Sequence, residues 1–282
     1  MTENHMGTGQ ADLPLPTGVA RPHLLTGLAS HVGHVRSRNE DAVLELVSAQ
    51  KGDLSGVEFG LFIVADGMGG QAEGQWAANL AVRTVAQAIV RQIYLPFLHD
   101  SAARAENPPL QEALLDALRR ANDAVHGTLP ESGTTLTAVL IIGNQAHVAH
   151  VGDSRAYVVY PDRVERLTRD HTLVERLLEL GQLSAGEAAL HPQRNVLYRA
   201  IGQGEGLEID VSHHTLAPGA RLLLCCDGLW GVVPEDSLVA IVRRALTPQD
   251  ACHQLVAAAL QAGGPDNVTA LVVEMVGDPH ET

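Results

Sequence analysis

The sequence predicts an α+β fold of antiparallel strands, with helices that come in consecutive pairs. Strand-like apolar runs follow one another over 134–160, separated only by glycine-containing turns. Helical periodicity appears in neighbouring segments, one pair over 75–126 and another after Pro234. An alternating βαβ protein would instead place a helix after nearly every strand. The 282 residues, 45% of them hydrophobic, can bury a large core, and we expect one domain over residues 23–276.

The first half of the chain is predicted to contain a strand-rich segment and then a pair of helices. Residues 1–22, rich in glycine, proline and polar groups, are expected to form a disordered leader. Apolar or alternating residues predict strands at 24–35, 42–47 and 59–65, with a hairpin-type loop at 51–56. Apolar residues at helical spacing predict helices over 75–93, which Pro96 ends, and over 110–126.

The second half is predicted to be mainly strands. They are expected at 134–142, 147–151 and 156–160, which would form a meander, and at 207–213, 221–226 and 268–275. The segment 168–204 breaks this rhythm with two short helices of its own, and such an insertion is typical of a functional flap. Pro234 opens one further helix. Thr247-Pro248-Gln249-Asp250 opens another with an N-cap and a proline at N1, and Gly263-Gly264 ends it. Residues 277–282 are a tail.

Composition limits the partners. The formal net charge of -14 argues against a nucleic-acid or anionic-membrane surface, since both require clustered Lys and Arg. Apolar runs are strand-sized, and the first residues lack a signal-peptide layout. Two of the three cysteines, Cys225 and Cys226, are adjacent and would point to opposite faces of a strand, which favours core packing over a disulfide framework. We expect a cytoplasmic monomer with no nucleic-acid or membrane partner.

Four aspartates stand next to predicted strands, each beside small residues: Asp66, Asp153, Asp227 and Asp266. The first three follow apolar runs, and the fourth precedes the last strand. A single Asp-Gly pair is also a common turn dipeptide, and alone it would indicate a turn more often than a ligand. Four aspartates in the same setting are hard to explain as four independent turns. They predict one acidic cluster.

Clustered carboxylates repel one another unless a cation neutralises them. Ligation by oxygen alone selects hard ions such as Mg²⁺ or Mn²⁺, and the histidines are not spaced like zinc ligands. Two hard cations bridged by an aspartate can activate a shared water and clamp a phosphoryl group. Arg36, four residues before Glu40 and close to Asp41, is the candidate fork for the phosphate, because a guanidinium matches phosphate bidentately.

Six short motifs carry a resemblance to a known family. They are Arg36-x-x-Asn39-Glu40-Asp41, Val64-Ala65-Asp66-Gly67-Met68-Gly69-Gly70, Gly133-Thr134-Thr135, Gly152-Asp153-Ser154-Arg155, Cys226-Asp227-Gly228 and Asp266-Asn267. As an ordered set covering about residues 24–274, they resemble the metal-dependent protein phosphatases of type 2C in their compact bacterial form. The resemblance implies a four-layer αββα sandwich, two antiparallel sheets face to face with helix pairs outside. It also implies hydrolysis of phosphoserine and phosphothreonine in proteins by a metal-activated bridging water.

The resemblance assigns roles residue by residue. The implied ligands of two Mn²⁺ or Mg²⁺ ions are Asp66, which bridges them, the Gly67 carbonyl, Asp227 and Asp266. Asp153, with Asp227, would hold a third ion. Glu40 and Asp41 would act through metal-bound waters, Asn267 would support the ligands, and Arg36 would bind the phosphate. The implied catalytic residues are Arg36, Asp66 and Asp227. The segment 168–204 corresponds to the mobile flap that tunes substrate access.

Two positions depart from the family pattern. Gln75 stands where the family usually has an acid just before the following helix, and this change is expected to affect only helix capping. The family often has a histidine after the Asp-Gly-Met-Gly-Gly glycines, and this chain has Gln71, which cannot give up a proton. The general acid is therefore left unassigned. The expected partners are phosphoprotein substrates and a serine/threonine kinase that the enzyme opposes.

The sequence also bears on other classes of function. Gly67-x-Gly69-x-x-Ala72 also fits a dinucleotide fingerprint, but Asp66 would repel the pyrophosphate. No cysteine is followed by an arginine six positions later, which excludes a cysteine-based phosphatase, and no P-loop is present. The remaining alternative is a catalytically weak or silent module of the same fold with a regulatory or binding role. Such a module would be expected to lose metal-binding acids, and here they are all present.

Overall fold

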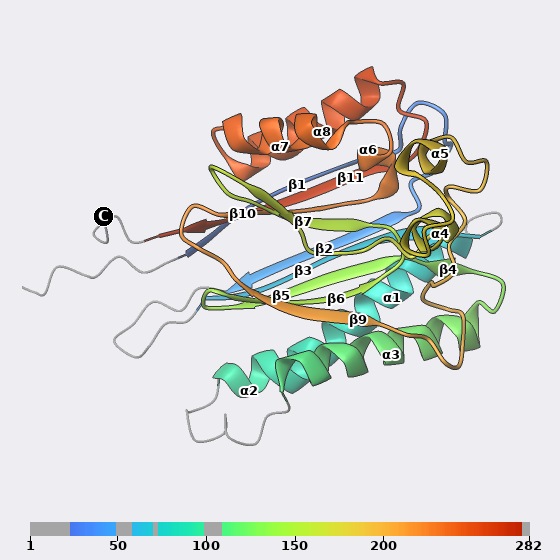
Figure 1. The fold of residues 1–282 in the computed structure, drawn as a ribbon. Helices are drawn as coiled ribbons and strands as arrows, with labels where there is room; N and C mark the ends of the chain where they lie inside the picture. The colour runs from blue at the N-terminus through green and yellow to red at the C-terminus, as the bar shows by residue number, and fades with distance from the viewer. Residues whose placement is uncertain (1–22, 49–57, 70–72, 99–108, 278–282) are drawn as a thin grey trace, which may run out of the picture.

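The computed structural model describes residues 23–48, 58–69, 73–98 and 109–277. Two antiparallel sheets are stacked face to face, and helices cover the outer face of each (Figure 1). The predicted α+β sandwich of four layers is confirmed. The predicted leader (1–22), the loop at 51–56, Gln71 and residues 278–282 lie outside the described residues.

The first sheet has the strand order β2-β3-β5-β6-β9, with the short β4 paired to β3. Its strands are β2 (Asp41–Ser48), β3 (Phe59–Met68), β4 (Gly133–Thr134), β5 (Leu136–Ile142), β6 (Gln145–Val151) and β9 (Asp210–Thr215). The interior strand β3, which lies between β2 and β5, is buried on both faces from Phe59 to Ala65. This explains why its sequence is a continuous apolar run rather than an alternating one.

The second sheet has the order β1-β11-β10-β7-β8. Its strands are β1 (His23–His31), β7 (Arg155–Val159), β8 (Val164–Arg166), β10 (Arg221–Cys225) and β11 (Val268–Val276). The inner faces of the two sheets share one apolar core, to which Phe62 and Val64 of β3 and Leu222 and Leu224 of β10 contribute. The central strands are thereby fixed relative to each other, and so are the residues at their ends.

Two helix pairs form the outer layers. α1 (Glu73–Ile89) and α3 (Leu110–Thr128) pack on the first sheet, while α7 (Glu235–Arg244) and α8 (Pro248–Gln261) pack on the second (Figure 1). The predicted start of α8 is confirmed, since the Thr247 side chain accepts a hydrogen bond from the Asp250 N–H. Pro96 does not end the first helix as predicted. A π-helical turn, η1 (Val90–Tyr94), follows α1, and Pro96 lies in the short α2 (Leu95–Leu98). Because the turn before Pro96 is wider than an α-helical turn, it leaves room for the proline ring, which has no N–H to donate.

The predicted meander is wrong at its third strand. β5 and β6 form a hairpin, but β7 belongs to the other sheet. Gly152, at φ 111°, lies in the connection that carries the chain across. A short apolar run such as that of β7 looks the same in either sheet, so the sequence pattern could not reveal the crossing.

The segment 168–204 contains two helices, as predicted: α4 (Leu173–Glu179), capped by Thr172, and α5 (Ala185–Ala189), capped by Ser184. Both lie at one end of the sandwich (Figure 1). Two short elements were not predicted, β8 and the single-turn α6 (Asp227–Trp230).

Candidate metal centre

The two sheets bring acidic residues to the same end of the sandwich. Asp66 lies near the end of β3, and the antiparallel register places it opposite Asp41, the first residue of β2. Asp227 lies just after β10, and Asp266 comes just before β11, the neighbour of β10. Asp153 lies in the connection from β6 to β7. Strand ends from both sheets therefore gather the four predicted aspartates and Asp41.

The pKa values of these acids reflect their burial first and their proximity to one another second. Burial raises the pKa of Asp66 well above its usual range, and the charges of Asp41, Asp227 and Asp153 raise it further. Burial also raises the pKa of Asp153 strongly, with Asp227 as the next cause. Burial raises the pKa of Asp41 to about 7, and the pKa of Asp227 is raised chiefly by burial, with a contribution from Asp266. The cluster carries more buried negative charge than it can hold ionised without a cation.

Two threonines fix the backbone of Asp66. Its N–H donates to Thr135 Oγ1 over 2.9 Å, and its carbonyl accepts from the Thr135 N–H over 2.9 Å and from Thr134 Oγ1 over 2.8 Å. Thr135 Oγ1 also lies 2.7 Å from Ser154 Oγ, in the connection that holds Asp153. The Gly-Thr-Thr motif noted in the sequence thus links two acids of the cluster.

The glycines after Asp66 and Asp227 lie against other segments of the chain. A Cβ on Gly67 would lie 2.1 Å from the Gly74 carbonyl oxygen, and one on Gly228 would lie 1.9 Å from the Asn267 carbonyl oxygen. Any larger residue would push these backbones apart. The Asp-Gly pairs therefore serve close packing of the strand ends.

Asn267 joins Asp266 to the loop before β2. Its Oδ1 accepts from the Glu40 N–H over 2.8 Å, and its Nδ2 donates to the carbonyls of Val32 (2.9 Å) and Arg38 (2.8 Å). Its own N–H donates to Asp266 Oδ1 over 2.9 Å. The predicted supporting role of Asn267 thus has a geometric basis, because a single amide fixes the loop beside an acid of the cluster.

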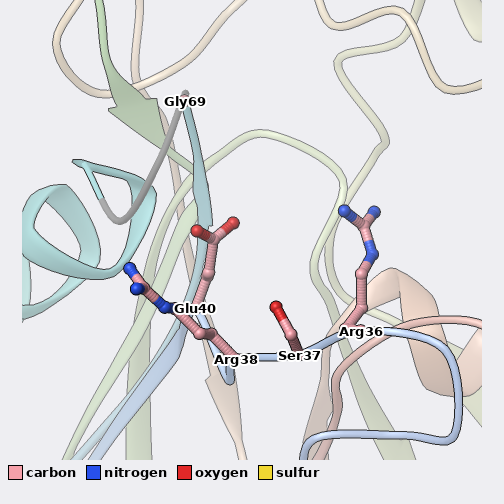
Figure 2. A pocket seen from close by; sticks show the side chains of 5 residues that line it. All are labelled: Arg36, Ser37, Arg38, Glu40 and Gly69. Carbon is pink, nitrogen blue, oxygen red and sulfur yellow. The ribbon is translucent and has the colours of Figure 1, made fainter.

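Arg36 lies at the rim of the cluster. Its Nη2 donates to Asp266 Oδ2 over 2.7 Å, and this hydrogen bond is the largest cause that raises the pKa of Arg36. The side chain remains 54% exposed, so it can reach a ligand in solvent. A polar cavity of about 480 Å³ lies beside it, lined by Arg36, Ser37, Arg38, Glu40 and Gly69. Figure 2 shows the guanidinium groups of Arg36 and Arg38 on either side of Glu40.

The donor set fits hard divalent cations. The aspartates offer carboxylate oxygens, the ligands that Mn²⁺ and Mg²⁺ prefer. Among the ion pairs between described residues, none includes Asp41, Asp66, Asp153 or Asp227. Asp41 Oδ1 is buried without a hydrogen-bond partner in the same part of the chain. A bound cation would neutralise the aspartates that lack an ion pair and would contact the oxygen that lacks a hydrogen bond.

The sequence matches the family model described as protein phosphatase 2C over residues 30–262. The chain belongs to this family. None of the helices in the described part of the chain has the length and apolar character of a membrane span.

Similar members of the phosphatase 2C family come from several bacteria. The serine/threonine phosphatase Stp of Listeria innocua is 34% identical over 86% of this chain and 92% of the relative. The protein phosphatase PhpP of Streptococcus pneumoniae is 34% identical over 88% of this chain and 96% of the relative. The crystal structure of the Mycobacterium tuberculosis serine/threonine phosphatase PstP/Ppp superposes with a TM-score of 0.74 at 31% identity, covering 90% of this chain and 99% of that one.

One of the similar structures contains metal. The PstP catalytic domain, 30% identical with a TM-score of 0.71 over 90% of this chain and 98% of that one, is a complex with two manganese ions. The predictions of a protein-serine/threonine phosphatase and of Mn²⁺ or Mg²⁺ as its cofactor are confirmed by these comparisons. They support the enzyme rather than a catalytically silent module of the same fold.

A second buried network, which the sequence did not reveal, lies beside the cluster. Arg155 donates to Asp170 from Nε (3.0 Å) and Nη2 (2.6 Å), and its guanidinium stacks 3.5 Å from the ring centre of Trp230. Trp230 Nε1 donates to the Asp153 carbonyl over 2.9 Å. The only signal in the sequence was Arg155 itself, directly after the Gly-Asp-Ser motif. Its partners lie in the flap and in α6, which were not predicted to meet it.

His171 ties the flap to the same connection. Its N–H donates to the Gly152 carbonyl over 2.7 Å, and its Nδ1 accepts from the Gly152 N–H over 3.1 Å. Nε2 lies 3.2 Å from Asp210 Oδ2, and this contact is the largest cause that lowers the pKa of Asp210. The base of the flap is therefore fixed to the residue before Asp153.

Proposed function

We propose that the acidic cluster is the site at which this phosphatase hydrolyses phosphoserine and phosphothreonine in phosphoproteins. Asp66, the Gly67 carbonyl, Asp227 and Asp266 would hold two Mn²⁺ or Mg²⁺ ions. Glu40, Asp41 and Asn267 would orient the metal ligands and the waters bound to the ions. The observation that carries this proposal is the convergence of Asp66, Asp153 and Asp227, whose pKa values are raised and which form no ion pair with another described residue.

The ions, when bound, would supply Lewis-acid stabilisation of the phosphoryl group and an activated water. The protein supplies position. Asp66 is suited to lie between two ions, since it is close to Asp227 from one sheet and Asp41 from the other. Arg36 would bind the phosphate through its guanidinium, because the side chain is half exposed and tethered to the cluster through Asp266. The polar cavity beside it is large enough for a phosphorylated side chain.

We also propose that Asp153, with Asp227, binds a third ion. Asp153 is 5% exposed, and the charge of Asp227 is a leading cause of its raised pKa, which places the two carboxylates near each other. We further propose that the enzyme is a cytoplasmic monomer with one catalytic domain over residues 23–276. Residues 168–204 would move as a flap. The substrates would include a serine/threonine kinase and the targets of that kinase.

Hydrolysis of p-nitrophenyl phosphate and of a phosphothreonine peptide tests the site. We expect release of phosphate only with Mn²⁺ or Mg²⁺, and its loss on addition of a chelator. Asp66→Ala and Asp227→Ala should each lower the rate by more than about a hundredfold, beyond the loss typical of a merely supporting residue, while the circular dichroism spectrum remains that of the folded protein. Undiminished turnover in either variant refutes the assignment.

A further inference from the structure

One side chain in the cluster is not an oxygen donor. Cys226, between β10 and Asp227, is fully buried, and its Sγ accepts from the Thr269 N–H over 3.1 Å. Asp41, Asp66 and Cys226 each offer a ligand atom that lies within 4.8 Å of the ligand atoms of the other two. A thiol therefore lies close to two carboxylates.

Asp41 provides the second observation. Its Oδ2 accepts a hydrogen bond from Thr269 Oγ1 over 2.6 Å, whereas Oδ1 is buried and finds no hydrogen-bond partner in the described part of the chain. A buried carboxylate oxygen without a donor is costly, and a bound cation would remove that cost. Asp41, which carries this unpartnered oxygen, belongs to the same group of three side chains as the Cys226 thiol.

The chemistry of this donor set differs from that of the aspartates alone. Mn²⁺ and Mg²⁺ prefer oxygen, whereas zinc and cadmium favour sites that include a thiolate. Tetrahedral zinc with sulfur at about 2.3 Å and oxygen at about 2.1 Å would bring ligand atoms to roughly 3.5 Å of one another. Side-chain movements of about 1 Å would be enough to bring the three groups to that spacing.

We propose that Asp41, Asp66 and Cys226 form a site for a thiophilic divalent cation, zinc or cadmium, which shares Asp66 with the Mn²⁺ or Mg²⁺ centre and competes with it. On binding, the sulfur–metal bond replaces the S–H bond, and the proton leaves to solvent. Mn²⁺ and Mg²⁺ favour oxygen over sulfur as a ligand, so they do not replace the S–H bond of Cys226. The site thereby distinguishes thiophilic from hard ions.

The other two cysteines provide matched controls. Cys225 points to the opposite face of β10, into the apolar core beneath α7 and α8. Cys252 belongs to the same core, and its Sγ donates to the Gly27 carbonyl. Each is buried, like Cys226, but neither belongs to a group of three metal-binding side chains in the described residues.

The test is titration of the reduced, chelator-treated full chain with Cd²⁺. We expect an ultraviolet sulfur-to-cadmium charge-transfer band in the wild type and in Cys225→Ser and Cys252→Ser. Cys226→Ser should abolish the band and weaken Cd²⁺ binding at least about tenfold. Nuclear magnetic resonance of ¹¹³Cd bound to the wild type, which needs no variant, should show the high-frequency shift of a sulfur ligand. Absence of both signals in the wild type, or a band that persists in Cys226→Ser, overturns the proposal.

Competition between Mn²⁺ and Cd²⁺ completes the test. Only one part of this inference, the sharing of Asp66, rests on the proposed function. Excess Mn²⁺ should reduce the charge-transfer band, and a band that resists Mn²⁺ overturns the shared site. A wild type that hydrolyses p-nitrophenyl phosphate with Mn²⁺ but gives no Cd²⁺ band refutes this inference alone. A wild type that gives the band but has no Mn²⁺-dependent hydrolysis refutes the proposed function alone.

Discussion

Two groups of buried acids lie at the same end of the molecule, and they differ in how their charge is balanced. Asp170 is 4% exposed and receives two hydrogen bonds from the Nε and Nη2 groups of Arg155. Asp41 and Asp66 have no arginine, lysine or histidine partner in the described residues, and their pKa values are raised. Asp266 is intermediate between the two groups, because it has a cationic partner, Arg36, but the pair lies at the exposed rim.

The difference separates structural acids from those available to bind cations. A paired carboxylate is satisfied within the protein and stabilises the base of the flap. An unpaired buried carboxylate costs stability in the absence of a ligand, and this cost becomes binding affinity when a cation arrives. The acids at the strand ends therefore destabilise the metal-free protein and favour the binding of a cation.

The largest expected effect on stability is that of breaking the satisfied pair. Arg155→Met removes the hydrogen-bonded partner of the buried Asp170 and leaves it only the longer contact with Arg166, at 4.0 Å. We expect a loss of about 3–5 kcal/mol in the free energy of unfolding, measured by urea denaturation. Arg120→Met is the control, because Arg120 pairs with Asp116 on the exposed surface of α3 and should cost only about 0.5 kcal/mol. Equal, small effects in the two variants would remove the distinction between the two groups of acids.

Replacing an unpaired acid should stabilise the metal-free protein, whereas breaking the Arg155–Asp170 pair should destabilise it. In chelated protein the pKa of Asp41 is about 7, above its unfolded value of 3.8, so the folded state holds the proton more tightly. Stability should therefore fall as pH rises from about 4 to 7, by up to about 1.4 kcal/mol per pH unit. Asp41→Asn should flatten this slope and stabilise the chelated protein at pH 8.

Asp170→Asn is the matched control for Asp41→Asn. It should destabilise the protein at pH 8, because it removes the partner of Arg155. Thermal unfolding between pH 4 and 8, with and without Mn²⁺, measures both variants. Stability that rises with pH in the chelated wild type would contradict the pKa assigned to Asp41.

Arg36 should show the smallest effect on stability and a clear effect on substrate binding. Arg36→Ala is expected to change the free energy of unfolding by less than about 0.5 kcal/mol, since the pair with Asp266 is exposed. It should raise KM for phosphate esters by about tenfold or more with a smaller change in kcat, because a charged hydrogen bond to phosphate is lost. Arg36→Lys should recover part of that loss. An unchanged KM in Arg36→Ala means that another group holds the phosphate.

The sequence predicted features that depend on neighbouring residues in the chain. Each aspartate of the cluster is marked by the strand before or after it, so Asp66, Asp153, Asp227 and Asp266 could be found without coordinates. The capped start of α8 and the two helices of the flap were likewise local patterns. Comparison with the family then confirmed the activity and the metal.

Features that depend on distant pairing could not be predicted. The crossing of β7 to the second sheet leaves no mark in its short apolar run. Arg155 and Asp170 are 15 positions apart and meet only because the base of the flap folds back onto β7. Cys226 was interpreted as a core residue, which its burial confirms, but its proximity to Asp41 arises from two strands in different sheets.

Electron paramagnetic resonance of bound Mn²⁺ tests the central claim most directly. If Asp66 bridges two ions, the wild type saturated with Mn²⁺ should give the spectrum of a spin-coupled pair, and Asp66→Ala should give only uncoupled Mn²⁺ or none. A wild-type spectrum of isolated ions, or an unchanged coupled spectrum in folded Asp66→Ala, would contradict the account.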